Sequence, residues 1–132
     1  MQSLTIGALA KRGGVHLETI RYYERRGLMP PPARKSSGHR AYASAAVERL
    51  QFIRHAQALG FSLAEIKELL AFKAPPDRSC AEAAKRIQDK LREIEEKIKD
   101  LRAIQRTLSR MKKSCEGHCL VSECPILESL ER

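Results

Sequence analysis

Residues 16–31, HLETIRYYERRGLMPP, decide the fold of this chain. Leu17, Ile20 and either Tyr23 or Glu24 recur at the spacing of one helix face, and Gly27 is placed to end that helix. The prolines that follow must be extended, because proline fixes φ and disfavours a helical conformation in the residue before it. The stretch therefore predicts one helix that stops abruptly, as the second helix of a helix-turn-helix does.

The segments on either side agree with this interpretation. Upstream, Thr5 can cap a short helix that Gly13 and Gly14 interrupt. Downstream, residues 33–42 (ARKSSGHRAY) are polar and basic and contain Gly38, which predicts a tight hairpin or loop.

Two further helices are predicted before residue 75. Ser44 is placed to cap the first of them, which Gly60 stops. Ser62 and Glu65 have the spacing of a capping box and predict the start of the second. The prolines at residues 75–76 then mark a domain boundary.

A long helical pattern follows, and neither Gly nor Pro interrupts it over residues 77–114. Its apolar residues are three or four positions apart, as in a coiled-coil seam, and charged residues occupy the other faces. A small chain has little with which to cover such a stripe, so we expect a partner helix from a second copy. The alternative is that the stripe packs against the front half of its own chain. The seam consists of Ile87, Leu91, Ile94, Ile98, Leu101, Ile104, Leu108 and Met111.

Charge is unevenly distributed along the 132 residues, whose net charge is +9. Residues 1–75 hold 12 basic and 5 acidic residues, whereas residues 76–132 hold 13 and 11. A basic front half indicates a polyanion-binding surface, and the alternative is a basic surface that only aids solubility.

Length and hydropathy exclude several classes of protein. No apolar run approaches the roughly 20 residues that span a bilayer, and the first residues lack the build of a signal peptide. We therefore expect a cytoplasmic protein that does not enter membranes. The chain is short for a substrate pocket beside a second domain, and no acid–base or nucleophile constellation stands out, so we do not expect an enzyme.

The motif TIRYYERRGL at residues 19–28 is followed by the pattern Gly-Xaa-Arg-Xaa-Tyr at residues 38–42. With the long helix, these motifs resemble the MerR family of bacterial transcription regulators over essentially the whole chain. The resemblance implies a fold dominated by α-helices. It places a winged helix-turn-helix DNA-binding domain with a second helix pair at residues 1–75 and a long antiparallel coiled-coil dimerisation helix at residues 76–113. A metal-binding loop and a short terminal helix then occupy residues 114–132.

DNA contacts are expected on the exposed face of the helix over residues 17–26, which would enter the major groove. The resemblance supports Arg21, Tyr22 and Tyr23, although Tyr23 is equally a candidate core residue. Arg49 and Arg54 are expected on a solvated face instead. The candidate DNA-binding residues are Thr19, Arg21, Tyr22 and Tyr23 on the helix and Arg34, His39 and Arg40 on the wing.

The resemblance also implies a mechanism. A homodimer binds promoter DNA whose spacer is too long, and the inducer-bound dimer bends and untwists that DNA so that RNA polymerase engages both promoter elements. Deforming a site of this length costs on the order of 1–6 kcal/mol. A metal that binds one state of the dimer better than the other could supply this free energy.

The cysteines predict the same assembly. A helix rises about 1.5 Å per residue, so Cys80 and Cys115 lie roughly 50 Å apart in one chain. A metal–thiolate bond is only about 2.3 Å long, taking zinc as the guide. In an antiparallel dimer, however, the start of one helix meets the end of the other. The predicted site combines Cys80 of one subunit with Cys115 and Cys124 of the other, twice per dimer.

Three thiolates suit a soft metal ion. By resemblance, Cys80 indicates a sensor of divalent ions, and the step from Cys115 to Cys124 with the CPILESL ending looks most like the mercury(II)-responsive regulators of mercury-resistance operons. Lead(II) sensors have similar spacing. Cys119 or His118 could add a fourth ligand, which would favour zinc(II) or cadmium(II). The alternatives are that Cys119 is a loop thiol that binds no metal and that His118 is only a solvent-exposed side chain. A regulator that senses oxidants through disulfides between the loop cysteines is the alternative class.

Overall fold

The structure is a computed structural model that describes residues 3–34 and 40–132, the side chains at 33, 34 and 40 excepted. The chain divides into two compact units, Met1–Ala84 and Lys85–Arg132. The finer division at residues 75 and 113 stays a prediction. Within the described part of the chain, no helix is both long enough and apolar enough to cross a membrane.

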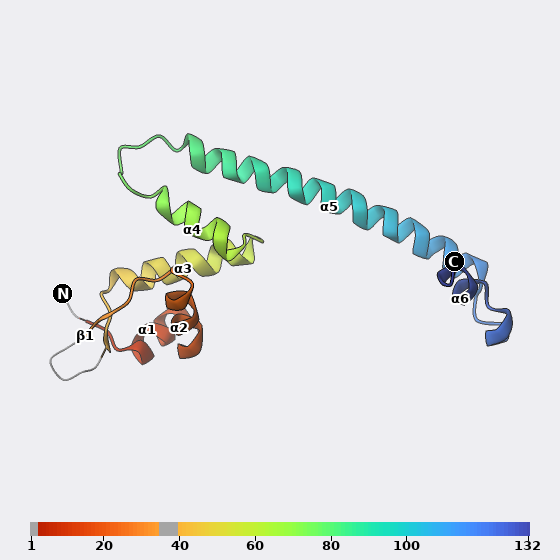
Figure 1. The fold of residues 1–132 in the computed structure, drawn as a ribbon, viewed down its shortest axis with the longest axis horizontal. Helices are drawn as coiled ribbons and strands as arrows, with labels where there is room; N and C mark the ends of the chain where they lie inside the picture. Colours follow the sequence, from red (N-terminus) through yellow and green to blue (C-terminus); the bar gives the residue numbers. More distant parts are fainter. Residues whose placement is uncertain (1–2, 35–39) are drawn as a thin grey trace. The chain divides into compact units, whose positions relative to one another are not determined.

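The first unit is the predicted helix-turn-helix with a small hairpin and a second helix pair (Figure 1). The hairpin strands are antiparallel and pair Ala33 with Ala41. An isolated bridge between Leu4 and Tyr42 ties the start of the chain to the end of the hairpin. The elements are α1 (Ile6–Gly13), α2 (Leu17–Arg25), β1 (Ala33–Arg34), β2 (Arg40–Ala41), α3 (Ala45–Ala58) and α4 (Leu63–Ala71).

Two of the three predicted helix caps are confirmed. The Thr5 hydroxyl accepts a hydrogen bond from the Ala8 N–H at 3.1 Å. In the capping box of α4, the Ser62 N–H donates to the Glu65 carboxylate at 2.8 Å, and the Glu65 N–H donates to the Ser62 hydroxyl at 3.2 Å. The expected Ser44 cap is wrong. Ser44 already has helical angles (φ −57°, ψ −31°), whereas a capping hydroxyl needs an extended backbone to fold back on the helix.

The core of the first unit lies where α1, α2, α3 and α4 meet. α1 packs against α2 and α3, and α3 packs against α4. The contact between α1 and α3 is close, because a Cβ added at Gly13 would lie 2.1 Å from Cδ2 of Leu50. The fully buried side chains are Leu9, Ile20, Leu28, Met29, Leu50, Ile53 and Ile66.

Two arginines of α3 form hydrogen bonds to the end of α1 and to the segment that follows α2. Arg54 donates to the Gly13 carbonyl at 2.6 Å, and Arg49 donates to the Leu28 carbonyl at 2.6 Å. Arg49 is half-buried, so the expectation of a solvated face is corrected for Arg49, whereas Arg54 is exposed as expected although it makes this hydrogen bond. The Gly13 carbonyl belongs to the last residue of α1 and has no partner within that helix, whereas the Leu28 carbonyl lies in the segment after α2.

The second unit contains most of α5 (Ala81–Ser114), the turn η1 (Val121–Glu123) and α6 (Pro125–Leu130). α5 confirms the long predicted helix, although it begins at Ala81 and not at residue 77. Seven of the eight seam residues, Ile87 to Leu108, are 39–63% exposed in the single chain. Within the second unit these side chains are left uncovered, and both a partner helix and the front half of the same chain stay predictions for what covers the stripe.

Candidate metal centre and nucleic-acid interface

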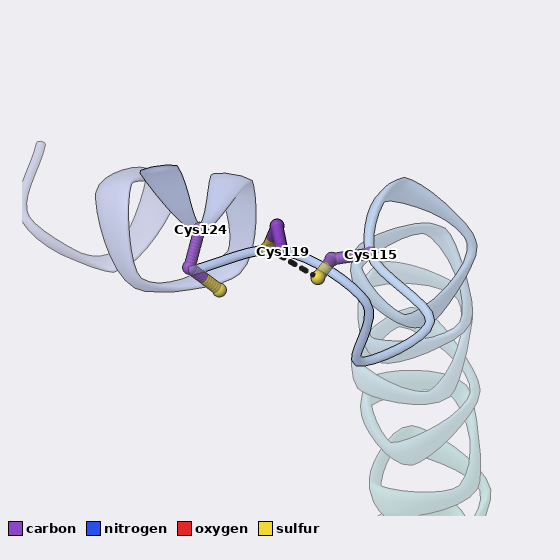
Figure 2. A group of neighbouring side chains, drawn as sticks. All are labelled: Cys115, Cys119 and Cys124. Carbon is purple, nitrogen blue, oxygen red and sulfur yellow. Dashed lines mark hydrogen bonds between the residues drawn. The ribbon is translucent and has the colours of Figure 1, made fainter. Parts of the chain in front are cut away.

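Three cysteine side chains converge in the connection between α5 and α6 (Figure 2). Cys115 directly follows the last residue of α5, and Cys124 directly precedes α6. Cys119 lies in the irregular segment, residues 115–120, between α5 and η1. Their sulfur atoms all lie within 4.8 Å of one another. The Cys115 and Cys119 sulfurs are 3.0 Å apart, and every cysteine of the chain is a free thiol.

The local backbone explains this convergence. Gly117 has a φ of +91°, a conformation that side chains with a Cβ rarely adopt, and it turns the chain back after α5. Cys124 is fixed from both sides, because its N–H donates to the Val121 carbonyl and its carbonyl accepts from the Glu128 N–H. Pro125 occupies the first turn of α6, where its missing N–H costs no hydrogen bond. The predicted turn and terminal helix are therefore confirmed.

The thiols of Cys115 and Cys119 shift each other's pKa in opposite directions. A hydrogen bond from the Cys119 thiol, followed by one from the Gly117 backbone, lowers the pKa of Cys115 below its usual value of 9.0. The same contact with Cys115, with desolvation as the next cause, raises the pKa of Cys119 to about 11. Cys115 is therefore the thiol of this pair that deprotonates first, with Cys119 as its hydrogen-bond donor.

The donor set fits a soft metal ion. Sulfur atoms about 2.3 Å from a tetrahedral zinc would lie roughly 3.8 Å from one another, so the observed cluster needs little rearrangement to close around an ion. Thiolate sulfur disfavours magnesium and calcium, which prefer oxygen ligands.

The other candidate ligands lie outside this cluster. Cys80 is an exposed residue of the first compact unit, one position before α5. His118 is exposed and lines a shallow cavity of about 360 Å³ together with Glu116, Cys119 and Glu123. The structure thus gathers Cys119 with Cys115 and Cys124. The sequence left the role of Cys119 open, because the spacing of the cysteines does not fix the path of the loop.

On α2, the candidate DNA-binding side chains differ in exposure. Arg21 and Tyr22 are exposed, and Thr19 is half-buried. Arg21 forms an ion pair with Glu18 at 2.9 Å. Tyr23 is only 4% exposed, and its hydroxyl donates to the Gln57 amide oxygen at 2.5 Å. This burial favours the packing role for Tyr23.

Two arginines at the end of α2 flank the exposed tyrosine. The guanidinium groups of Arg25 and Arg26 lie 6.0 and 5.9 Å from the centre of the Tyr22 ring. Sequence reasoning did not single out Arg26, although its position four residues after Tyr22 was the available signal. The wing candidates cannot be compared in the same way, because His39 and the side chains of Arg34 and Arg40 lie outside the described residues.

Two protein-family models match the chain. The model described as "MerR HTH family regulatory protein" matches residues 4–73, and the model described as "MerR, DNA binding" matches residues 47–111. The matched stretches together contain all the helices of the first unit and most of α5.

Similar proteins include a regulator of mercuric resistance and a regulator crystallised with lead(II). The mercuric resistance operon regulatory protein of Bacillus cereus is 43% identical over 95% of each chain. The HTH-type transcriptional regulator ZntR of Escherichia coli K12 is also 43% identical, over 96% of this chain and 92% of its own. The crystal structure of the regulator PbrR691 from Ralstonia metallidurans CH34 in complex with lead(II) has a TM-score of 0.88 and 35% identity. It covers 96% of this chain and 98% of its own.

Proposed function

The chain belongs to the MerR family of DNA-binding transcription regulators, and from this premise we propose that it activates transcription in response to a soft divalent metal ion, specifically mercury(II). The observation that carries the proposal is the convergence of three thiols within 4.8 Å at the end of α5. Lead(II), zinc(II) and cadmium(II) are the competing effectors, because thiolate sulfur binds all of these ions.

The proposed ligands come from two copies of the chain. Cys115 and Cys124 are the loop ligands that the sequence predicts, and Cys119, which lies close to both, is the candidate for a fourth position that the mercury(II) site does not need. Cys80 of a second copy completes the set. A site with three thiolates favours mercury(II) or lead(II), whereas a fourth ligand favours tetrahedral zinc(II) or cadmium(II).

The exposed seam of α5 supports dimerisation, and the charges of α5 support a head-to-tail orientation. Residues 81–97 carry five basic and five acidic residues, whereas residues 98–114 carry six basic residues and only Asp100 as an acid. Parallel pairing would set the two basic halves side by side. Antiparallel pairing sets each basic half beside a neutral half that contains acids, which avoids that repulsion. It also brings Cys80 of one copy toward the cysteine loop of the other.

The same dimer presents two DNA-binding units to a promoter. The exposed side chains of Arg21 and Tyr22 are the proposed contacts of α2, and the wing residues Arg34, His39 and Arg40 are proposed to contact the DNA backbone. Metal binding stabilises the dimer conformation that bends and untwists the promoter, so that RNA polymerase, the second partner, engages both promoter elements. The metal must favour that conformation by about 1–6 kcal/mol to offset the deformation of the DNA.

A competition titration tests the metal. The reduced protein is titrated with mercury(II), lead(II), zinc(II) and cadmium(II) while thiolate-to-metal absorption and transcription from the promoter are followed. We expect mercury(II) to bind with one ion per chain and to induce transcription at the lowest free-ion concentration. Induction by another ion at a lower concentration would reject mercury(II), and the absence of stoichiometric binding by all four would reject the metal-responsive function.

A pair of loop variants tests the site. Cys124→Ser removes one of the proposed ligands, so we expect it to bind promoter DNA normally but to lose metal-induced transcription. Ser122→Ala is the matched control, because it changes an exposed side chain of the same loop that is not a proposed ligand. Full induction of Cys124→Ser would show that Cys124 does not bind the effector.

A further inference from the structure

The short contact between Cys115 and Cys119 has a second chemical use. Their sulfur atoms are 3.0 Å apart, and a disulfide bond is about 2.05 Å long, so the pair needs to approach by only about 1 Å. The segment between Ser114 and Val121 contains no helix or strand that would resist this movement. Cys119 is exposed and Cys115 is half-buried, so a small oxidant in solution reaches the pair.

We propose that Cys115 and Cys119 form an intraloop disulfide when a peroxide oxidises the metal-free protein, and that this disulfide switches off metal sensing. The disulfide itself depends only on the geometry of the loop. Its effect on sensing rests on the proposed function, because it assumes that the Cys115 sulfur binds the effector.

The oxidation balances with hydrogen peroxide as the oxidant. The sulfur of one thiolate attacks a peroxide oxygen, the O–O bond breaks, and a sulfenic acid and hydroxide form. The second thiol attacks the sulfenic sulfur, the S–S bond forms, and the S–O bond breaks. In total the two thiols give up two protons and two electrons, and one peroxide becomes two waters.

The structure favours Cys119 over Cys124 as the partner of Cys115. Both sulfurs lie within 4.8 Å of the Cys115 sulfur, but the 3.0 Å contact is with Cys119. Cys124 is also fixed by backbone hydrogen bonds to Val121 and Glu128, whereas Cys119 lies in the irregular segment.

Oxidation and metal binding exclude each other at this site. A metal binds thiolate sulfur, and a disulfide sulfur has lost that character, so the disulfide removes two of the three gathered donors. By the same linkage, a bound metal protects the pair from peroxide. The loop would therefore report metal only while it is reduced.

Peptide mapping of the full-length protein tests the disulfide. The reduced protein is treated with hydrogen peroxide, its remaining thiols are alkylated, and it is digested with a protease that cuts after glutamate. Cleavage after Glu116 and Glu123 places Cys115, Cys119 and Cys124 on three separate peptides. We expect a linked pair that contains Cys115 and Cys119 and separates on reduction. A link to Cys124, or complete alkylation of all three thiols, would overturn the proposal.

Two matched serine variants separate the pair from its neighbour. Cys124→Ser retains the pair, so it should form the disulfide at the wild-type rate. Cys119→Ser should form no link, and the sulfenic acid at Cys115 should accumulate and be trapped by dimedone. If Cys119→Ser instead links Cys115 to Cys124 as fast as the wild type forms its own disulfide, the assignment of the pair is wrong.

Metal uptake by the same samples tests the switch. We expect mercury(II) uptake by the oxidised wild type to fall at least tenfold and to return after treatment with dithiothreitol. Unchanged uptake by protein whose disulfide has been mapped would reject the switch. If the fully reduced protein takes up no metal, the proposed function fails, and the peptide map still decides whether the disulfide forms.

Discussion

At the scale of single residues, Gly13 shows how closely the helices of the first unit pack. Its hydrogen atom occupies a position where a methyl group would lie 2.1 Å from the Leu50 side chain. Gly7, on the same helix, has open space, because its nearest neighbour to an added Cβ is Thr5 at 3.9 Å. The two glycines therefore form a matched pair.

We expect Gly13→Ala to lower the free energy of unfolding by about 1–3 kcal/mol, because it overpacks the contact between α1 and α3. Gly7→Ala should raise it by about 0.5–1 kcal/mol, because alanine has the higher helix propensity. Urea unfolding at one fixed protein concentration measures both. Adding Leu50→Ala to Gly13→Ala should cost less than Leu50→Ala costs alone, and additive losses would contradict the proposed clash.

Arg21 carries the second prediction at this scale. Its guanidinium is exposed and is proposed to contact DNA, but it is paired with Glu18. Arg21→Ala should weaken promoter binding by about 1–3 kcal/mol and reduce its salt dependence if the contact is to a phosphate. Glu18→Gln should strengthen binding, because it removes a competing negative charge. Arg92→Ala on α5 is the control, and fluorescence anisotropy over a salt series is the measurement. Equal affinities for Arg21→Ala and Arg92→Ala would exclude Arg21 as a contact.

Local sequence patterns predicted the roles of some of these side chains and missed the roles of others. The Thr5 cap and the Ser62–Glu65 capping box follow from three-residue spacings, and both were found. The roles of Arg49 and Arg54 depend on carbonyls that lie 21 and 41 residues away in the sequence, so no local pattern reveals them. The place of Cys119 depends on the turn of the loop, which periodicity does not encode.

At the scale of elements, α5 was the most predictable part of the fold. The apolar residues of its seam recur at helical spacing through seven consecutive intervals. One irregular position in so long a pattern does not hide the helix. The pattern without Gly or Pro starts at residue 77, but α5 begins at Ala81. The Ala81 N–H donates a hydrogen bond to the Ser79 hydroxyl at 3.2 Å, a local contact that the apolar spacing does not reveal. The hairpin strands, each only two residues long, are too short to show a period of their own.

The seam gives a prediction for the whole element. Ile98→Lys places an ammonium group in the middle of the proposed dimer interface, where burial without a partner costs several kcal/mol. We expect the dimer dissociation constant to rise roughly 100-fold or more, since each 1.4 kcal/mol is a factor of ten. Glu96→Lys introduces the same side chain two positions away and off the seam. Sedimentation equilibrium should show a monomer for the first variant and a dimer for the second, and two dimers would place the interface elsewhere.

At the scale of the whole molecule, the proposed head-to-tail dimer predicts complementation between two defective chains. A Cys80→Ser chain and a chain carrying both Cys115→Ser and Cys124→Ser should each fail to bind the effector as homodimers. A mixed dimer contains one complete site, made from Cys80 of one chain and the loop of the other. Refolding the two together with different affinity tags and purifying the mixed species should restore one ion per dimer. No recovery in a verified mixed dimer would reject ligands shared between subunits.

The half-exposed stripe on α5 also has a consequence for the life of the protein in a cell. Because another copy is proposed to cover it, we expect the stripe of a newly made chain to stay accessible to proteases until a second chain arrives. Its lifetime and its melting temperature then both increase with its own abundance.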